Sequence, residues 1–160
     1  MAKVLVYSIG LFNKLMQDNN LNDDNVENLN NSAFISICGD GENHHFKNDH
    51  VNVLNLDFED VSNDLYDNNG KLVARVISDE QAEKSVKFIN QNMGKDFYIH
   101  CSAGISRSQA FFRFITMYYA NMYDEKTCGR KENPCEFPNI EVLSKLKKAE
   151  HKLFVSNSLS

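Results

Sequence analysis

Residues 98–108, YIHCSAGISRS, place a nucleophilic thiol and a cation six positions apart. Cys101 follows the short run FYIH, and Gly104 precedes Arg107 in a segment of small side chains. A loop of this composition can direct several backbone N–H groups at an anion, and an arginine adds a planar fork that binds two oxygens of a phosphoryl group. A cysteine beside such donors is commonly ionised at neutral pH. The pattern therefore indicates a cysteine nucleophile aimed at a bound phosphoryl group.

The residues around the thiol have predicted supporting roles. His100 is expected to order the loop by hydrogen-bonding its backbone, and the Ser108 hydroxyl is expected to donate to the sulfur when the thiolate leaves. Gly104 allows a backbone conformation that a side chain would obstruct. The predicted substrate-binding loop comprises Ser102, Ala103, Gly104, Ile105, Ser106 and Arg107.

The order His-Cys, five residues, Arg and Ser in HCSAGISRS resembles the signature of the cysteine-dependent protein tyrosine phosphatases, and AGISRS resembles their dual-specificity subgroup. The runs VLNLDFEDVSND, SDEQAEKSVKFI and FYIHCSAGISRS are similar to a small bacterial and phage group of predicted tyrosine phosphatases. The resemblance covers residues 33–119 and, more faintly, 138–149. It implies a phosphotyrosine protein phosphatase II-like fold and hydrolysis of phosphotyrosine through a phosphocysteine intermediate, with activity on phosphoserine and phosphothreonine as an open alternative.

Members of this family also use an Asp upstream of the nucleophile to protonate the departing oxygen, a contribution of about 10²–10⁴-fold. Asp60 is the first choice for this general acid because it ends a predicted strand, which is where the family's acid falls. Asp57 and Asp64 remain alternatives. Cys101 lies 41 positions after Asp60 (101 minus 60), a longer separation than in compact dual-specificity enzymes, and the segment LYDNNGKLVARV is the expected cause.

Other functions are compatible with a cysteine in an anion loop. A phosphoinositide or an RNA 5′-triphosphate would favour additional Lys or Arg inside the loop, and CSAGIS contains none. Rhodanese and arsenate-reductase chemistry fits the complete pattern less well. Outside the enzymes, a catalytically silent phosphopeptide-binding module would keep the pocket without turnover. A phosphorylated protein is therefore the expected partner, and the sequence does not indicate an oligomeric state.

Charge and hydropathy exclude several classes of protein. The net charge of −5 argues against a nucleic-acid binder that neutralises many phosphates. The N-terminal run MAKVLVYSIGLF is a poor signal peptide, and no apolar stretch approaches membrane-spanning length. At 160 residues the chain is expected to form a single catalytic domain over residues 1–160, located in the cytoplasm.

Neither the cysteines nor the histidines are spaced as a metal site. The four cysteines lack paired CxxC spacing, and Cys128 and Cys135 are expected to be incidental reduced thiols. No carboxylate or thiol stands at a ligand spacing from His44, His45 and His50. We therefore expect neither a metal nor a cofactor.

The elements that must position the thiol alternate between strand and helix patterns. Such alternation predicts an α/β fold with a central, largely parallel sheet and helices on both faces. Cys101 then lies at the carboxyl end of a strand, where ligands bind in open α/β sheets. Segment 61–77 is expected to be a long loop. The predicted strands cover 3–8, 33–38, 50–60 and 97–100, and the predicted helices cover 10–17, 78–94, 110–119 and 140–150.

Overall fold

The structure is a computed structural model of the chain, and it describes residues 2–123, 129–130 and 137–155. Cys128 and Cys135, expected to be incidental thiols, lie outside these ranges. Within the described ranges, each helix is too short or too polar to traverse a lipid bilayer.

Within the described residues, the centre of the fold is a parallel sheet of five strands in the order β3-β2-β6-β1-β7. This arrangement confirms the predicted α/β class. In the register, His100 at the end of β6 lies beside Tyr7 on β1 and Ser36 on β2, so Cys101 leaves the sheet at its middle strand. The strands are β1 Val4–Tyr7, β2 Ser32–Cys38, β3 Val53–Asp57, β6 Asp96–His100 and β7 Gly129–Arg130.

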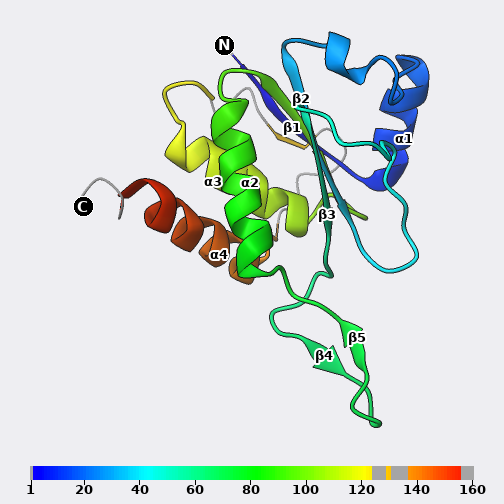
Figure 1. Cartoon of the computed structure of the whole chain (residues 1–160), viewed down its shortest axis with the longest axis vertical. Coiled ribbons are helices and arrows are strands. Elements are labelled where there is room, and N and C mark those ends of the chain that lie inside the picture. The colour runs from blue at the N-terminus through cyan, green and yellow to red at the C-terminus, as the bar shows by residue number, and fades with distance from the viewer. Residues whose placement is uncertain (1, 124–128, 131–136, 156–160) are drawn as a thin grey trace.

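Helices cover both faces of this sheet, as predicted. Figure 1 shows α1 on one side and α2, α3 and α4 together on the other. The helices are α1 Ile9–Asp18, α2 Asp79–Gln91, α3 Arg107–Tyr118 and α4 Ile140–Glu150, with a 3₁₀ turn at Val26–Asn28 and a π turn at His151–Val155.

Two apolar clusters fill the space between the sheet and its helices, and β2 contributes to both because successive side chains alternate between faces. Ile35 and Ile37 join the cluster under α2, α3 and α4, whereas Phe34 joins the cluster under α1. Ser36 and Cys38 continue the α1 face. Along β6 the same alternation puts Ile99 with the larger cluster, and His100 therefore faces α1.

The segment expected to be a long loop contains a hairpin, which corrects that prediction. Strands β4 Leu65–Tyr66 and β5 Leu72–Ala74 pair antiparallel, and the hairpin projects from the rest of the molecule (Figure 1). Asp67 closes the turn, because its carboxylate accepts the backbone N–H of Asn69 and of Lys71. The strands are too short and too exposed to show the alternation that predicts a strand.

The start of α2 agrees with the sequence-based prediction, whereas the start of β3 does not. The predicted capping box is present, since the Ser78 hydroxyl accepts the N–H of Gln81 and the Gln81 side chain accepts the N–H of Ser78. The third strand is shorter than the predicted 50–60. It begins at Val53, whose N–H donates to the carbonyl of His50 in a tight turn.

Candidate anion-binding and catalytic site

Two hydrogen-bonding groups contact the Cys101 sulfur. The residue is 2% exposed, and its sulfur accepts the backbone N–H of Gly104 at 3.3 Å. The Ser108 hydroxyl lies 3.1 Å from the same sulfur. If the sulfur is a thiolate, the Ser108 hydroxyl can only donate to it, and this bond and the Gly104 N–H then both stabilise the negative charge.

Gly104 lets the loop turn its amide toward the sulfur. Its φ is +69°, and a Cβ added to it would lie 2.8 Å from the backbone carbonyl atoms of Tyr7. Both the left-handed conformation and the close approach of β1 therefore require glycine. The loop is also tied to the start of α1, because the N–H of Ile9 donates to the carbonyl of Ser102 at 3.0 Å.

The loop runs into the N-terminus of α3, which begins at Arg107. The first N–H groups of a helix have no partner inside it, and they favour a bound anion. Ser106, at the capping position, does not cap the helix with its side chain. Its hydroxyl donates to Asp60 instead. The N-terminus of α3 therefore has no side-chain cap from Ser106.

Arg107 is fixed beside the loop although it is buried. Its Nη1 donates to the carbonyl of Phe58 and its Nη2 donates to the Ser102 hydroxyl, each at 2.8 Å. The Ser102 hydroxyl in turn lies 2.8 Å from both carboxylate oxygens of Glu42. A guanidinium carries five N–H donors, so these contacts orient Arg107 and leave other N–H groups for an anion.

Glu42 supplies a negative charge near this cation. Burial alone would raise the pKa of Glu42, but hydrogen bonds from the N–H of Gly39 and from Ser102, together with the charge of Arg107, outweigh burial and lower it. Glu42 was not among the predicted site residues. It follows the GDG turn after β2, and because β2 neighbours β6, the strand order would have pointed to it.

Of the three candidate acids, Asp60 contacts the loop. Its Oδ1 accepts the Ser106 hydroxyl at 2.7 Å and the side-chain N–H of Asn139, at the start of α4, at 2.8 Å. Asp57 lies 2.8 Å from His44 instead. Asp64 accepts the backbone N–H of Val76 at the base of the hairpin. Asn139 is a second site residue that sequence reasoning missed.

His100 lies beneath the loop, fully buried. Its Nε2 is 2.7 Å from the Ser36 hydroxyl, and its ring centroid is 4.4 Å from that of Phe12. Burial, assisted by nearby His45, lowers the pKa of His100 to about 3. His100 is therefore a neutral imidazole at physiological pH, and its hydrogen bond joins the end of β6 to β2.

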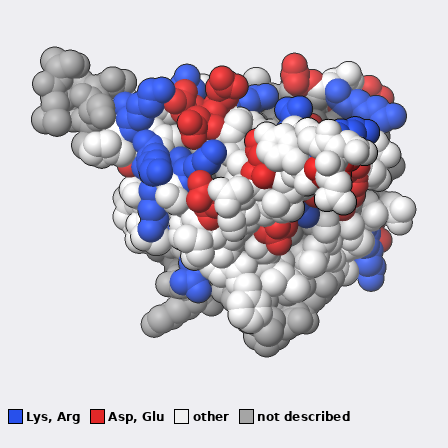
Figure 2. Space-filling view, turned by 90° about the horizontal axis from the view of Figure 1, so that it is seen from below, with Lys and Arg blue, Asp and Glu red and all other residues white. Residues whose placement is uncertain are grey.

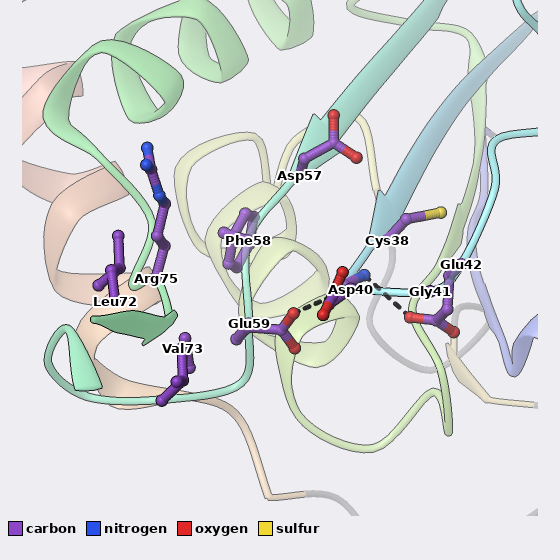
Figure 3. A pocket seen from close by; sticks show the side chains of 12 residues that line it. Cys38, Asp40, Gly41, Glu42, Asp57, Phe58, Glu59, Leu72, Val73 and Arg75 are labelled. Atoms are coloured by element: carbon purple, nitrogen blue, oxygen red, sulfur yellow. Dashed lines mark hydrogen bonds between the residues drawn. The ribbon is translucent and has the colours of Figure 1, made fainter. Parts of the chain in front are cut away.

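A groove opens beside the site, between the ends of β2 and β3 and the hairpin. It has a volume of about 460 Å³, and Figure 3 shows Asp40, Glu42 and Glu59 on one side of it, with Leu72 and Val73 on the other. Because Glu42 also contacts Ser102 of the anion loop, the groove adjoins the site.

The sequence matches no protein-family model, and no curated protein is significantly similar to it. What the arrangement can do chemically therefore follows from its residues. A sulfur with converging donors, a loop and helix start that face an anion, an oriented guanidinium and a nearby carboxylate are the groups needed to transfer a phosphoryl group through a covalent intermediate.

Proposed function

We propose that this protein is a cysteine-dependent phosphatase that hydrolyses phosphotyrosine on proteins. The observation that carries the proposal is the convergence of the Gly104 amide and the Ser108 hydroxyl on the Cys101 sulfur, in a loop that also orients Arg107. A buried cysteine present only for packing needs none of these neighbours.

In the first step the phosphoryl oxygens bind the loop amides and the free N–H groups of Arg107. The Cys101 thiolate attacks phosphorus in line with the departing oxygen, so a P–S bond forms as the P–O bond breaks. Asp60 gives its proton to that oxygen. Arg107 and the loop amides stabilise the charge of the transition state.

The position of the Asp60 proton follows from its contacts. Oδ1 accepts hydrogen bonds from both Ser106 and Asn139, so in the acid form the proton resides on Oδ2. The two donors hold the carboxyl group beside the loop in either protonation state.

In the second step water hydrolyses the phosphocysteine. The carboxylate of Asp60 takes a proton from the water, whose oxygen attacks phosphorus while the P–S bond breaks. The Ser108 hydroxyl donates to the sulfur as it leaves as a thiolate, and inorganic phosphate is released. Cys101 and Asp60 then stand in their starting states.

Two observations favour this function over its rivals. A silent phosphopeptide-binding module does not need an acid, whereas Asp60 is hydrogen-bonded to the loop. Long polyanions such as RNA need a broad basic surface. On the face seen in Figure 2, basic and acidic side chains are interspersed, which favours a compact phosphoryl group as ligand.

The experiment is hydrolysis of p-nitrophenyl phosphate and of a phosphotyrosine peptide by the reduced protein, compared with Cys101→Ser. We expect turnover of both substrates by the wild type and neither by the variant. Cys38→Ser is the matched control, because Cys38 is also buried but contacts Ser36 and His44 and not the residues of the loop. Binding of the phosphopeptide by wild-type protein without turnover would contradict the proposal and favour the silent module.

A further inference from the structure

Four side chains form a continuous line of hydrogen bonds from the surface to the base of the candidate site. Asp57 Oδ1 lies 2.8 Å from His44 Nε2, and His44 Nδ1 lies 2.7 Å from Ser36 Oγ. Ser36 Oγ lies 2.7 Å from His100 Nε2. The side-chain exposure is 76% at Asp57 and 16% at His44, and His100 at the inner end is fully buried.

The hydroxyl of Ser36 is the critical member of this line, because it has one proton and two imidazole neighbours at 2.7 Å, closer than the Cys38 sulfur at 3.8 Å. When it donates to His44, it accepts from His100; when it accepts from His44, its proton is free for His100. His44 Nε2 must keep its own hydrogen, since Asp57 is an acceptor. The charge of His44 therefore determines which way the Ser36 proton points.

We propose that His44 and Ser36 are positioning residues that set the tautomer of His100. With neutral His44, protons reside on His44 Nε2, Ser36 Oγ and His100 Nε2. With protonated His44, they reside on both nitrogens of His44, on Ser36 Oγ and on His100 Nδ1. The net difference is one proton taken from solvent.

The consequence reaches the nucleophile through the backbone. His100 Nδ1 is buried and adjoins the backbone of Cys101, the residue that carries the thiol. When His44 is neutral, His100 Nδ1 carries no hydrogen and is an acceptor. When His44 is protonated, His100 Nδ1 carries a hydrogen and is a donor. The effect of His44 and Ser36 on turnover rests on the proposed phosphatase function, whereas the tautomer itself does not.

Other titratable and charged groups also lie near these four side chains, and we do not expect them to control the direction of the Ser36 proton as His44 does. Burial raises the pKa of the Cys38 thiol to about 11, so this group, 3.4 Å from His44 Nδ1, stays neutral. Burial and the proximity of His44 lower the pKa of His45. The charges that remain near these rings belong to Asp57, Glu42 and Arg107.

The test is ¹⁵N NMR of the histidine side chains of the full chain between about pH 8 and pH 5, the range over which histidines commonly titrate. We expect the bare nitrogen of His100 to be Nδ1 in molecules with a neutral His44 and Nε2 in molecules with a protonated His44. In Ser36→Ala the tautomer of His100 no longer follows His44. Cys38→Ala is the matched control, because it removes the thiol that contacts both His44 and Ser36 but leaves the four side chains of the line in place, and it keeps the coupling.

A His100 tautomer that stays constant while His44 titrates in the wild type would overturn the inference. So would a tautomer that still follows His44 in Ser36→Ala. If that variant does not fold, His44→Phe removes the same connection and is expected to leave His100 with one pH-independent tautomer population. Because these signals need no substrate, an inactive protein with the expected tautomer change would refute the phosphatase proposal alone.

Discussion

The Ser106 hydroxyl donates to Asp60 Oδ1 at 2.7 Å, although 46 positions of the chain separate the two residues. The hairpin lies within that separation and does not displace Asp60. At its base the N–H of Glu59 donates to the carbonyl of Arg75 at 2.7 Å, so the chain returns to where it left the sheet. The long spacing between Asp60 and Cys101 is thus compatible with Asp60 as the general acid.

Replacing Asp60 should separate leaving-group protonation from the rest of the reaction. For Asp60→Asn we expect kcat on a phosphotyrosine peptide to fall about 10²-fold or more, because the departing phenolate must leave unprotonated. The loss on p-nitrophenyl phosphate should be smaller, since its leaving group needs little protonation. The basic limb of the pH–rate profile on the peptide should disappear. Asp64→Asn is the control, and loss of activity there with Asp60→Asn unchanged would move the acid to Asp64.

Gly104→Ala should damage both stability and activity. The added Cβ would meet the backbone of Tyr7 at 2.8 Å, and the residue would keep a left-handed conformation that costs about 1–3 kcal/mol. We expect urea denaturation to show a free energy of unfolding lower by at least that amount. Gly10→Ala is the control, and we expect it to change the free energy of unfolding in the opposite direction. Gly10 lies inside α1 with open space around it, so alanine should stabilise by about 0.5–1 kcal/mol.

Arg107→Lys should remove most of the activity while keeping the positive charge. The planar guanidinium of Arg107 donates to the Phe58 carbonyl and the Ser102 hydroxyl and has further N–H groups for an anion. The single ammonium group of lysine cannot make all of these contacts. Loss of such donors costs about 10²–10³-fold in kcat, and inhibition by inorganic phosphate should weaken in parallel. Arg75→Lys, in the adjoining groove, should change neither quantity. Wild-type kinetics for Arg107→Lys would exclude the predicted role of the fork.

The buried imidazole of His100 should make stability depend on pH. Burial lowers its pKa to about 3 in the folded chain, against a reference value of 6.5. Between these values the unfolded chain binds more protons, so the free energy of unfolding should fall as the pH drops from about 6.5 towards 3. The slope from this one group is at most about 1.4 kcal/mol per pH unit.

Urea denaturation at several pH values in that window, for wild type and His100→Asn, measures the effect. The difference between the two slopes isolates His100, because other titrating groups such as His50 are common to both. Equal slopes would show that His100 is not held neutral by the fold.

The sequence predicted those parts of the site that lie in one continuous segment. The loop from Cys101 to Ser108 and the capping box at Ser78 are formed by residues close together in the sequence, so the local sequence pattern is sufficient to predict them. The hairpin was missed because its strands are two and three residues long and largely exposed. The two-residue strand β7 was missed for the same reason of length.

Glu42 and Asn139 were missed because tertiary packing alone brings them to the site. Glu42 reaches Ser102 across 60 positions, and Asn139 reaches Asp60 across 79. A helix-capping Asn and an acid after a turn are common local features, and nothing in their own segments marks them as site residues. The order of the parallel strands is the additional information that brings Glu42 beside the loop.

Trapping the covalent intermediate addresses the proposed chemistry at its first step. Asp60→Asn is mixed with p-nitrophenyl phosphate, quenched in acid and digested, and the peptide containing Cys101 is analysed by mass spectrometry. We predict a phosphoryl group on the Cys101 sulfur, because this substrate needs little help from the acid to form the intermediate whereas the hydrolysis step loses its base. Substrate turnover by the wild type that persists in Cys101→Ser, with no phosphate on Cys101 in the trap, would contradict the mechanism.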